Sequence, residues 1–359
     1  MKHQCTECSR AIGFEGMCYG CRQERKKAEY ESLSAEEIAV RYAEIEREIR
    51  ETGDLREHCE AFAALLGFCE TDTAALAQAA FENRLYWPPE LYRDASEEVQ
   101  NGLIALLETE QNLLTANHVL QALAVCGSET VRQAFVRWKA DPPAWRKRMH
   151  VDTDIYARQG GWTFDAQGKR QELVYRPCFA LDKGGCGAVK VAVPREDVCA
   201  DCGCRSVDLL DIEGSDSRLA FLNVRGRVRL PVCPSCVGLS DKTLIRYDEN
   251  GGAEYEIIGS FGEKNQVSPE EYGQLAANGL QLSAVPKQPY YVYGGEFSAI
   301  GGMPDWEQEP QYESCPDCGK TMKQLAVLRE GQLREYGEGS LYVQHCSECR
   351  VAAVFAQYT

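Results

Sequence analysis

Cysteine is the residue type whose number and spacing could support chemistry in this chain. The sequence has 18 cysteines among 359 residues, and twelve of them form six Cys-x-x-Cys pairs. The pairs combine two by two, separated by 9, 30 and 27 residues. Two residues between cysteines let one tight turn present both sulfurs to a metal, and zinc favours a tetrahedral shell of four thiolates. The sequence therefore predicts three structural zinc sites, with the ligands Cys5, Cys8, Cys18 and Cys21; Cys199, Cys202, Cys233 and Cys236; and Cys315, Cys318, Cys346 and Cys349.

Disulfides and isolated redox pairs are the alternatives to metal binding. Cytosolic thiols are kept reduced, so a cytosolic chain with this many cysteines is expected to bind metal. A redox motif or a chance pair would explain one Cys-x-x-Cys, but not three sets of two. His3 and His345 lie beside two of the sites and could replace a thiolate, although adjacent strand residues point to opposite faces, which favours His345 as a bystander. A fourth metal site built from Cys178, Cys186 and Cys204 stays open.

Glycine follows the second cysteine in two of the six pairs. These glycines are Gly203 and Gly319, each at the end of the leading turn of a metal set. Glycine adopts a positive φ angle at little steric cost. We therefore expect both turns to end in the left-handed region.

The elements that must position these cysteines change in character along the chain, which predicts an α+β multidomain protein. Residues 1–30 carry the first metal set and a strong helix-forming run, which predicts a small treble-clef-like zinc finger. Residues 31–150 are predicted to form a HEAT-like helical region. Residues 151–359 are rich in strand-forming runs broken by Gly, Pro and Asp. They are predicted to form a duplicated β domain with two zinc ribbons, at 199–236 and 315–349.

The helical prediction depends on caps and periodicity. Ser34 and Glu37 form the pattern of a capping box, which predicts a helix that runs to about Ile49. Glycines and proline pairs then separate further apolar-periodic stretches. Short helices joined by tight turns favour a HEAT-like array, with an ordinary helical bundle as the alternative. The further helices are predicted at about 55–69, 73–86, 96–108, 113–126 and 128–139.

An internal similarity within residues 151–359 predicts the duplication. The run Cys199-Ala-Asp-Cys-Gly is followed by Leu209 at the same offset at which Leu325 follows Cys315-Pro-Asp-Cys-Gly. Each copy then returns on a strand to its second Cys-x-x-Cys. The strand-forming runs lie at 173–175, 188–193, 227–232 and 340–343.

Three C-terminal segments carry a resemblance to a known family. They are Ala299-Ile-Gly-Gly-Met-Pro-Asp-Trp-Glu-Gln-Glu-Pro, Cys315-Pro-Asp-Cys-Gly-Lys-Thr-Met-Lys-Gln-Leu and Tyr336-Gly-Glu-Gly-Ser-Leu-Tyr-Val. These segments resemble the bacterial YwqG-like domain, which is related to the eukaryotic programmed-cell-death-two proteins. The resemblance is good over about 295–359, extends back to about 170 and is absent before 151. Bacterial chains that join HEAT-like helices to such a domain show the same arrangement.

The resemblance implies an internally duplicated β fold and a role in protein binding, with no enzymatic activity. The eukaryotic relatives look after a newly made ribosomal protein of the small subunit. Bacterial members have been proposed as immunity or housekeeping factors. The resemblance thus directs attention to protein partners.

The charge balance argues against two classes of partner. The chain has 39 Lys and Arg against 55 Asp and Glu, a formal net charge of −16. Such a field repels phosphate backbones and anionic lipids. No apolar run reaches the ~18 residues of a membrane span, and the N-terminal residues lack the apolar core of a secretory signal. We expect a cytoplasmic protein without membrane contact, whose oligomeric state the sequence leaves open.

Three classes of function remain. The main hypothesis is a non-enzymatic zinc-binding interaction factor that is chaperone-, adaptor- or immunity-like towards a basic client protein. Two observations favour it: helical arrays present concave surfaces, and an acidic surface suits a basic partner. An enzyme with an unrecognised carboxylate site is one alternative, although no catalytic motif is found and four thiolates close a zinc shell. A nucleic-acid-associated zinc-ribbon protein is the other. It is supported by two basic groups, Arg225, Arg227 and Arg229 at period two and Arg137, Lys139, Arg146, Lys147 and Arg148.

Trp306 is the candidate partner-binding residue. The turn signal Gly301-Gly302-Met303-Pro304 places it just ahead of the third metal set. Tryptophan is enriched among binding hot spots because it buries a large rigid area. A core tryptophan that anchors this loop is the alternative, and it is the favoured one.

Overall fold

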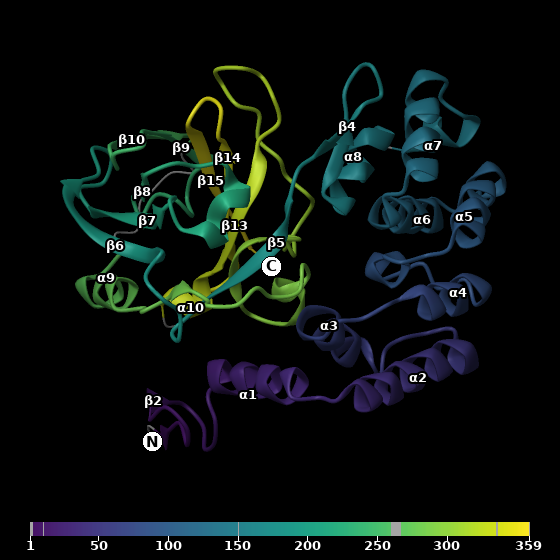
Figure 1. Ribbon diagram of the computed structural model, residues 1–359, viewed down its shortest axis with the longest axis horizontal. Helices are drawn as coiled ribbons and strands as arrows, with labels where there is room; N and C mark the ends of the chain where they lie inside the picture. Colours follow the sequence, from purple (N-terminus) through teal and green to yellow (C-terminus); the bar gives the residue numbers. More distant parts are fainter. Residues whose placement is uncertain (1–2, 10, 150, 260–266, 335–336, 359) are drawn as a thin grey trace. The chain divides into compact units, whose positions relative to one another are not determined.

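The chain forms two compact units in the computed structural model (Figure 1). Residues Met1–Glu31 and Val174–Thr359 make up one, here the β unit, and Ser32–Leu173 make up the other, here the helical unit. The α+β class predicted from the sequence is confirmed. Among the described residues, no helix is both long enough and apolar enough to span a bilayer. The structure describes residues 3–9, 11–149, 151–259, 267–334 and 337–358, so Tyr336 of the resemblance lies outside them.

The helical unit contains helices at all the positions where the sequence predicts them. The Ser34 hydroxyl accepts a hydrogen bond from the Glu37 backbone N–H, and the Glu37 carboxylate accepts one from the Ser34 backbone N–H at 2.8 Å, so the predicted capping box is present. Gly127 ends a later helix at φ 55°. The elements are α2 (Ala35–Thr52), α3 (Cys59–Phe68), α4 (Ala74–Glu82), η1 (Pro89–Tyr92), α5 (Glu97–Thr109), α6 (Leu113–Cys126), α7 (Glu129–Ala140), η2 (Ala144–Arg148), α8 (Thr153–Ala157), η3 (Arg158–Gly160), β3 (Trp162–Phe164) and β4 (Arg170–Glu172).

The hairpin of β3 and β4 belongs to the helical unit, because its tryptophan is part of the helical core. Trp162 is fully buried, its indole N–H donates to the Ala124 carbonyl at 2.8 Å, and its ring lies 5.6 Å from that of Phe135. The Arg170 guanidinium covers it at 4.8 Å. The unit boundary therefore lies at Leu173, whereas the sequence suggested a boundary near residue 150.

The β unit begins with a small hairpin and one helix, and continues after the helical unit with a large sheet. The helix α1 is attached to this sheet unit, since the Lys27 ammonium lies 4.7 Å from the Phe297 ring centroid and Glu31 pairs with Lys287 at 2.6 Å. The N-terminal segment is thus part of the β unit. The elements are β1 (His3–Gln4), β2 (Ala11–Ile12), α1 (Tyr19–Glu31), β5 (Tyr175–Asp182), β6 (Val189–Val198), β7 (Arg205–Glu213), η4 (Ser217–Leu222), β8 (Arg227–Val232), β9 (Lys242–Tyr247), β10 (Ala253–Ile258), α9 (Pro269–Ala276), β11 (Gln281–Leu282), η5 (Tyr291–Gly294), β12 (Ser298–Gly302), β13 (Lys323–Arg329), α10 (Glu330–Leu333), β14 (Ser340–Cys346) and β15 (Val351–Gln357).

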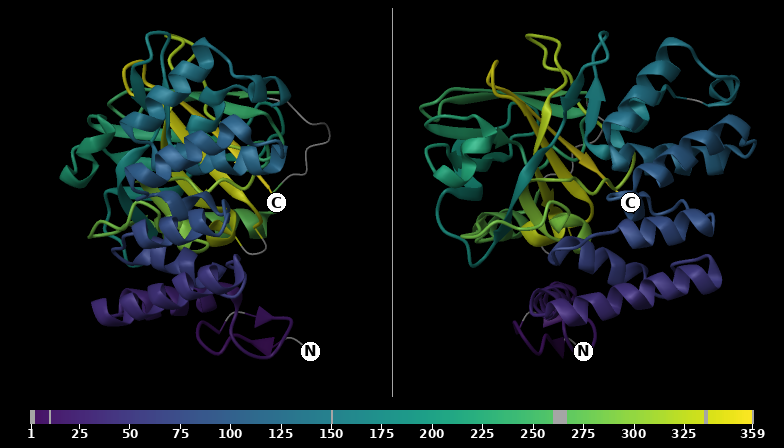
Figure 2. Two further views of the ribbon diagram at one scale, coloured as in Figure 1. Left: turned by 90° about the vertical axis from the view of Figure 1, so that its right-hand side faces the viewer. Right: turned by 45° about the vertical axis from the view of Figure 1, so that its right-hand side comes forward.

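The large sheet is an 11-stranded one in the order β10-β9-β15-β14-β13-β12-β5-β11-β6-β7-β8. Its named strand pairs are all antiparallel. The two ends of the sheet approach each other, because the Arg227 N–H at the start of β8 donates to the Glu249 carbonyl beyond β9 at 3.0 Å. The sheet is therefore curled in a barrel-like manner. Strands β15, β14 and β13 are consecutive neighbours within it and are drawn in yellow in Figure 2.

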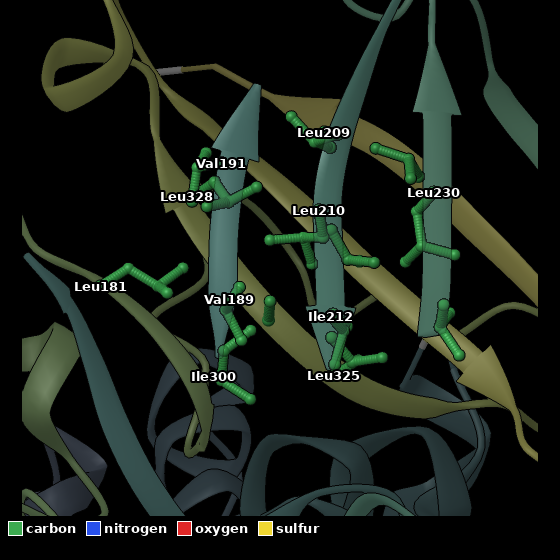
Figure 3. Close-up of a cluster of buried hydrophobic side chains, with 14 of the residues drawn as sticks. Leu181, Val189, Val191, Leu209, Leu210, Ile212, Leu230, Ile300, Leu325 and Leu328 are labelled. Atoms are coloured by element: carbon green, nitrogen blue, oxygen red, sulfur yellow. The ribbon is translucent and has the colours of Figure 1, made fainter. Parts of the chain in front are cut away.

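The core of the β unit lies within this curl. Apolar side chains from β5, β6, β7, β8, β12 and β13 converge there (Figure 3). Strand β14 is buried at all of its positions, so both faces of this strand are covered. Its polar residues Ser340, Gln344 and His345 are buried together with its apolar ones, and each has a hydrogen-bond partner within the β unit.

Candidate metal centres

The twelve cysteines of the six pairs come together in three clusters, with the membership that the spacing predicts. Within each cluster, the four sulfurs all lie within 4.8 Å of one another. The first cluster joins the β1–β2 hairpin to the start of α1. The second joins the β6–β7 and β8–β9 connections, and the third joins the segment before β13 to the β14–β15 connection. The clusters contain Cys5, Cys8, Cys18 and Cys21; Cys199, Cys202, Cys233 and Cys236; and Cys315, Cys318, Cys346 and Cys349.

Four of the six turns that present the sulfurs end in a residue with a positive φ angle. In the leading turns of the second and third clusters, the residue after the second cysteine donates its N–H to the carbonyl of the first at 2.9 Å. These residues are Gly203 at φ 74° and Gly319 at φ 72°, so the predicted left-handed conformation is confirmed. Ser9 and Arg350 occupy the corresponding positions after two other pairs and also have positive φ angles, of 58° and 57°. The knuckle thus imposes a strained conformation on two residues that are not glycine.

The sulfur geometry fits one tetrahedral metal ion per cluster. Four sulfurs at ~2.3 Å from a central zinc lie about 3.8 Å apart. The observed separations are 3.7 Å for Cys8 and Cys18, 3.9 and 3.4 Å for two pairs in the second cluster, and 3.8 Å for Cys318 and Cys346. A disulfide requires about 2.05 Å, and all these cysteines are free thiols. The donor set and its spacing therefore suit a thiophilic cation.

The three clusters differ in their burial. The second is the most enclosed, and Tyr255 and Ile257 of β10 pack against its sulfurs. The first and third each expose one cysteine, Cys8 and Cys318 respectively. An ion pair between Lys320 and Glu348 at 2.6 Å links the two turns of the third cluster. The second cluster thus exposes none of its cysteines, whereas each of the other two has one cysteine at the surface.

His345 lies beside the third cluster without joining it. Its Nε2 is 2.8 Å from the Tyr175 hydroxyl and its Nδ1 is 3.3 Å from the Tyr247 hydroxyl. Burial lowers the pKa of His345 to about 4, so the ring is neutral at physiological pH. The side chain therefore acts as a hydrogen-bonded core residue, in line with its position next to Cys346 on a strand.

The remaining candidate ligands are scattered. Among the described residues, the close groups of ligand atoms include neither His3 nor Cys178, Cys186 or Cys204. Cys178 is buried in the sheet and Cys186 is exposed. The Cys204 sulfur lies 3.2 Å from the Ser235 hydroxyl. The described part of the chain thus contains no fourth cluster.

Trp306 is half-buried and stacks on the sheet. Its ring lies 4.5 Å from Tyr342 of β14 at an interplanar angle of 19°, and Tyr312 packs edge-on at 5.3 Å. Its indole nitrogen is buried and has no hydrogen-bond partner among the described residues. The contacts are those of a loop anchor, and its role in partner binding stays a prediction.

The residues on either side of Trp306 pair with a buried arginine that the sequence analysis missed. The Arg329 side chain is only 3% exposed, and it forms ion pairs with Asp305 at 2.5 Å and with Glu307. Glu296 lies 3.8 Å away, and the Ser340 hydroxyl accepts a hydrogen bond from Arg329 at 2.8 Å. Burial raises the pKa values of Asp305 and Glu296, although Arg329 opposes the effect. One guanidinium thus organises the loop that carries Trp306.

Two of the three arginines at period two, Arg227 and Arg229, face carboxylates, whereas Arg225 is exposed and lies ahead of β8. Arg227 of β8 pairs with Asp211 of β7, with an Nε–Oδ1 distance of 2.8 Å. Arg229 lies 3.7 Å from Asp208, whose other oxygen binds Arg195 at 2.7 Å. Arg227 and Arg229 share one face of β8 as expected, but they form an ion-pair network with Asp208 and Asp211 within the protein.

Comparison with known proteins gives one informative relative. The chain is 27% identical over 348 residues to the uncharacterized protein YpfL of Salmonella typhimurium, covering 92% of this chain and 79% of YpfL. No protein-family model matches the chain. No solved structure matches it either. The similarity to YpfL spans both units of the structure.

Proposed function

We propose that this chain is a zinc-binding, non-enzymatic protein-interaction factor of the cytoplasm. The three cysteine clusters carry the metal part of the proposal, because their sulfur separations match a tetrahedral zinc–thiolate shell. Each ion would be held by four thiolates, which leaves no open coordination position for a substrate. The zinc ions would then stabilise the fold rather than catalyse a reaction.

A basic client protein is the partner that the charge of the chain favours. The net charge of −16 creates a field that attracts a basic surface and speeds its association. Helix α2 contains six glutamates and three arginines, so it carries a net negative charge. Four of the eight basic residues that would support nucleic-acid binding have carboxylate partners, among them Lys139, which binds Asp154 at 2.8 Å, and Arg227, which binds Asp211. These observations favour a chaperone-, adaptor- or immunity-like role.

The family relation is part of the same proposal. The order of elements around the second and third clusters is the same: a Cys-x-x-Cys turn, a strand, a short helical turn, a return strand, a second Cys-x-x-Cys turn and a further strand. This common order supports an internally duplicated, YwqG-like β domain. We propose likewise that the helical unit is HEAT-like.

Two measurements test the proposal. Elemental analysis of protein made with adequate zinc should find about three zinc ions per chain, one for each cluster. One ion or none would contradict the metal assignment. Affinity purification from the native host, followed by binding of the recovered partner in increasing salt, should give a basic protein whose association weakens as salt rises. Turnover of a small molecule by the purified chain, or recovery of nucleic acid alone, would contradict the interaction role.

A further inference from the structure

The first half of α2 presents an apolar stripe that the helical unit leaves uncovered. The buried residues of this helix are Ile45, Glu48 and Ile49, all in its second half. Ahead of them, the Val40 side chain is 58% exposed and Leu33 is half-buried. A surface helix normally packs its apolar stripe against a neighbour. Within the described residues of the helical unit, this part of the stripe is open.

The stripe forms one wall of a groove whose other wall is the start of α3. The groove has a volume of about 450 Å³. Pockets that bind organic ligands have volumes of roughly 300–1,000 Å³, so this groove can hold several side chains. Leu33, Val40 and Ala61 provide its apolar surface. It lies wholly within the helical unit, because all its lining residues belong to that unit.

The rim of the groove is acidic. Glu36, Glu37 and Glu44 line it, and Arg41 is the one cationic side chain among the lining residues, all of which are described. Hydrogen bonds from the Ser34 backbone and hydroxyl lower the pKa of Glu37, which keeps that carboxylate ionised. The groove thus combines an apolar floor with a net negative rim, which is complementary to a segment that is apolar on one face and cationic on its flanks.

We infer that this groove binds a basic amphipathic helix of the client protein. The inference rests on the proposed function and names the surface that performs it. Helix-in-groove recognition uses apolar side chains at i, i+3, i+4 and i+7, and here they contact Leu33, Val40 and Ala61. Lysine or arginine side chains on both flanks then contact Glu36 and Glu44. The length of the open stripe, from Leu33 to Glu44, corresponds to about three helical turns.

The test uses the full chain and a defined probe. A fluorescein-labelled peptide of leucine and lysine, patterned as an amphipathic helix, is titrated with the protein while anisotropy is measured. Val40→Asp should weaken binding by ~10-fold or more, because a carboxylate is placed in the apolar floor. Glu36→Gln with Glu44→Gln should weaken it several-fold and flatten its salt dependence. The matched control, Glu97→Gln with Glu98→Gln, removes two exposed glutamates from α5 and should leave binding unchanged.

Two further experiments test whether the basic peptide binds in this groove. A peptide of leucine and glutamate with the same pattern should fail to bind. A photo-crosslinker on the basic peptide should label residues of α2 and α3. Equal binding by wild type and Val40→Asp, equal binding of the acidic peptide, or labelling elsewhere would overturn the inference.

Binding of the partner recovered from the native host distinguishes a failure of this inference from a failure of the proposed function. If wild type and Val40→Asp recover the same basic partner with equal affinity, the groove is not its site, although the proposed function stands. If wild type recovers no protein partner, the proposed function fails, whereas the peptide titration still decides whether the groove binds a basic helix.

Discussion

Replacing Arg329 by methionine tests whether one guanidinium holds together the loop around Trp306. Methionine keeps the apolar volume of the stem and removes the charge. The change leaves Asp305, Glu307 and Glu296 without the cation that they share. It also removes the hydrogen bond to the Ser340 hydroxyl.

The size of the stability loss follows from the burial of Arg329 and of its three carboxylate partners. Removing one member of a buried ion pair costs about 3–5 kcal/mol, because the other charge stays buried and uncompensated. Asp305 and Glu296 keep 35% and 44% of their side-chain exposure, so water screens part of the loss, whereas Glu307 keeps only 14%. We therefore expect a loss of about 3 kcal/mol in the free energy of unfolding. In a unit of this size, that loss corresponds to a fall of roughly 6–12 °C in melting temperature.

The sign of the pH dependence follows from the raised carboxyl pKa values. A native pKa above the unfolded value means that the folded state holds the proton more tightly, so stability falls as pH rises through the native pKa. Burial raises the pKa values of Asp305 and Glu296 already in the wild type, and loss of Arg329 should raise them further. The stability difference between Arg329→Met and wild type should thus be smaller at pH 5.5 than at pH 8.

Denaturant unfolding followed by circular dichroism measures these changes, with metal content checked at each pH. Arg205→Met is the matched control, since Arg205 is 49% exposed and forms an ion pair at the surface with the fully exposed Glu196 at 3.2 Å; it should change stability by under about 1 kcal/mol. Asp305→Asn with Glu307→Gln should restore part of the stability of Arg329→Met. A loss no larger than that of the control would refute the role given to Arg329, as would absence of any recovery in the combined variant.

Three further predictions concern the cysteine clusters and Trp306. Cys236→Ser should destabilise the β unit more than Cys8→Ser does, because the second cluster is packed in the core and Cys8 is exposed; equal melting temperatures would contradict this order. Gly203→Ala should lower the free energy of unfolding by about 1 kcal/mol, and Ser9→Gly should raise it by a similar amount. The reason is that only glycine adopts these positive φ angles without strain. Chemical denaturation measures both changes, and changes of the opposite sign would show that the turns are unstrained. Trp306→Ala should cost ~3–5 kcal/mol if the ring is a loop anchor, whereas normal melting with loss of partner capture would identify it as a binding residue.

The local features of this protein could be predicted from its sequence, because neighbouring residues determine them. The Cys-x-x-Cys spacing defines the three clusters, since a metal-binding turn needs only four consecutive residues. The Ser34 capping box and the strand β8, which spans the predicted 227–232, are also determined within a few positions. Each of these features depends on short-range backbone geometry.

The long-range features could not be predicted in the same way. Trp162 belongs to the helical unit because its indole reaches Ala124, which is 38 positions away. The carboxylates that pair with the buried Arg329, Asp305 and Glu307, are 24 and 22 positions away from it in the sequence. Arg227 and Arg229 do share a sheet face, but Asp208 and Asp211 of a different strand decide that these two are paired. Their partners are distant in sequence, so periodicity carries no information about them.

The position of β15 in the sheet has a consequence for synthesis of the chain. The last strand in sequence lies between β9 and β14, and it pairs Val351 with Arg246 on one side and with Cys346 on the other. The sheet therefore cannot be completed until residues 351–357 have left the ribosome. A chain that ends before β15 would present two unpaired strand edges, which are templates for aggregation. Translation products that stop before Val351 should consequently be insoluble or degraded, whereas products that include β15 should accumulate as folded protein.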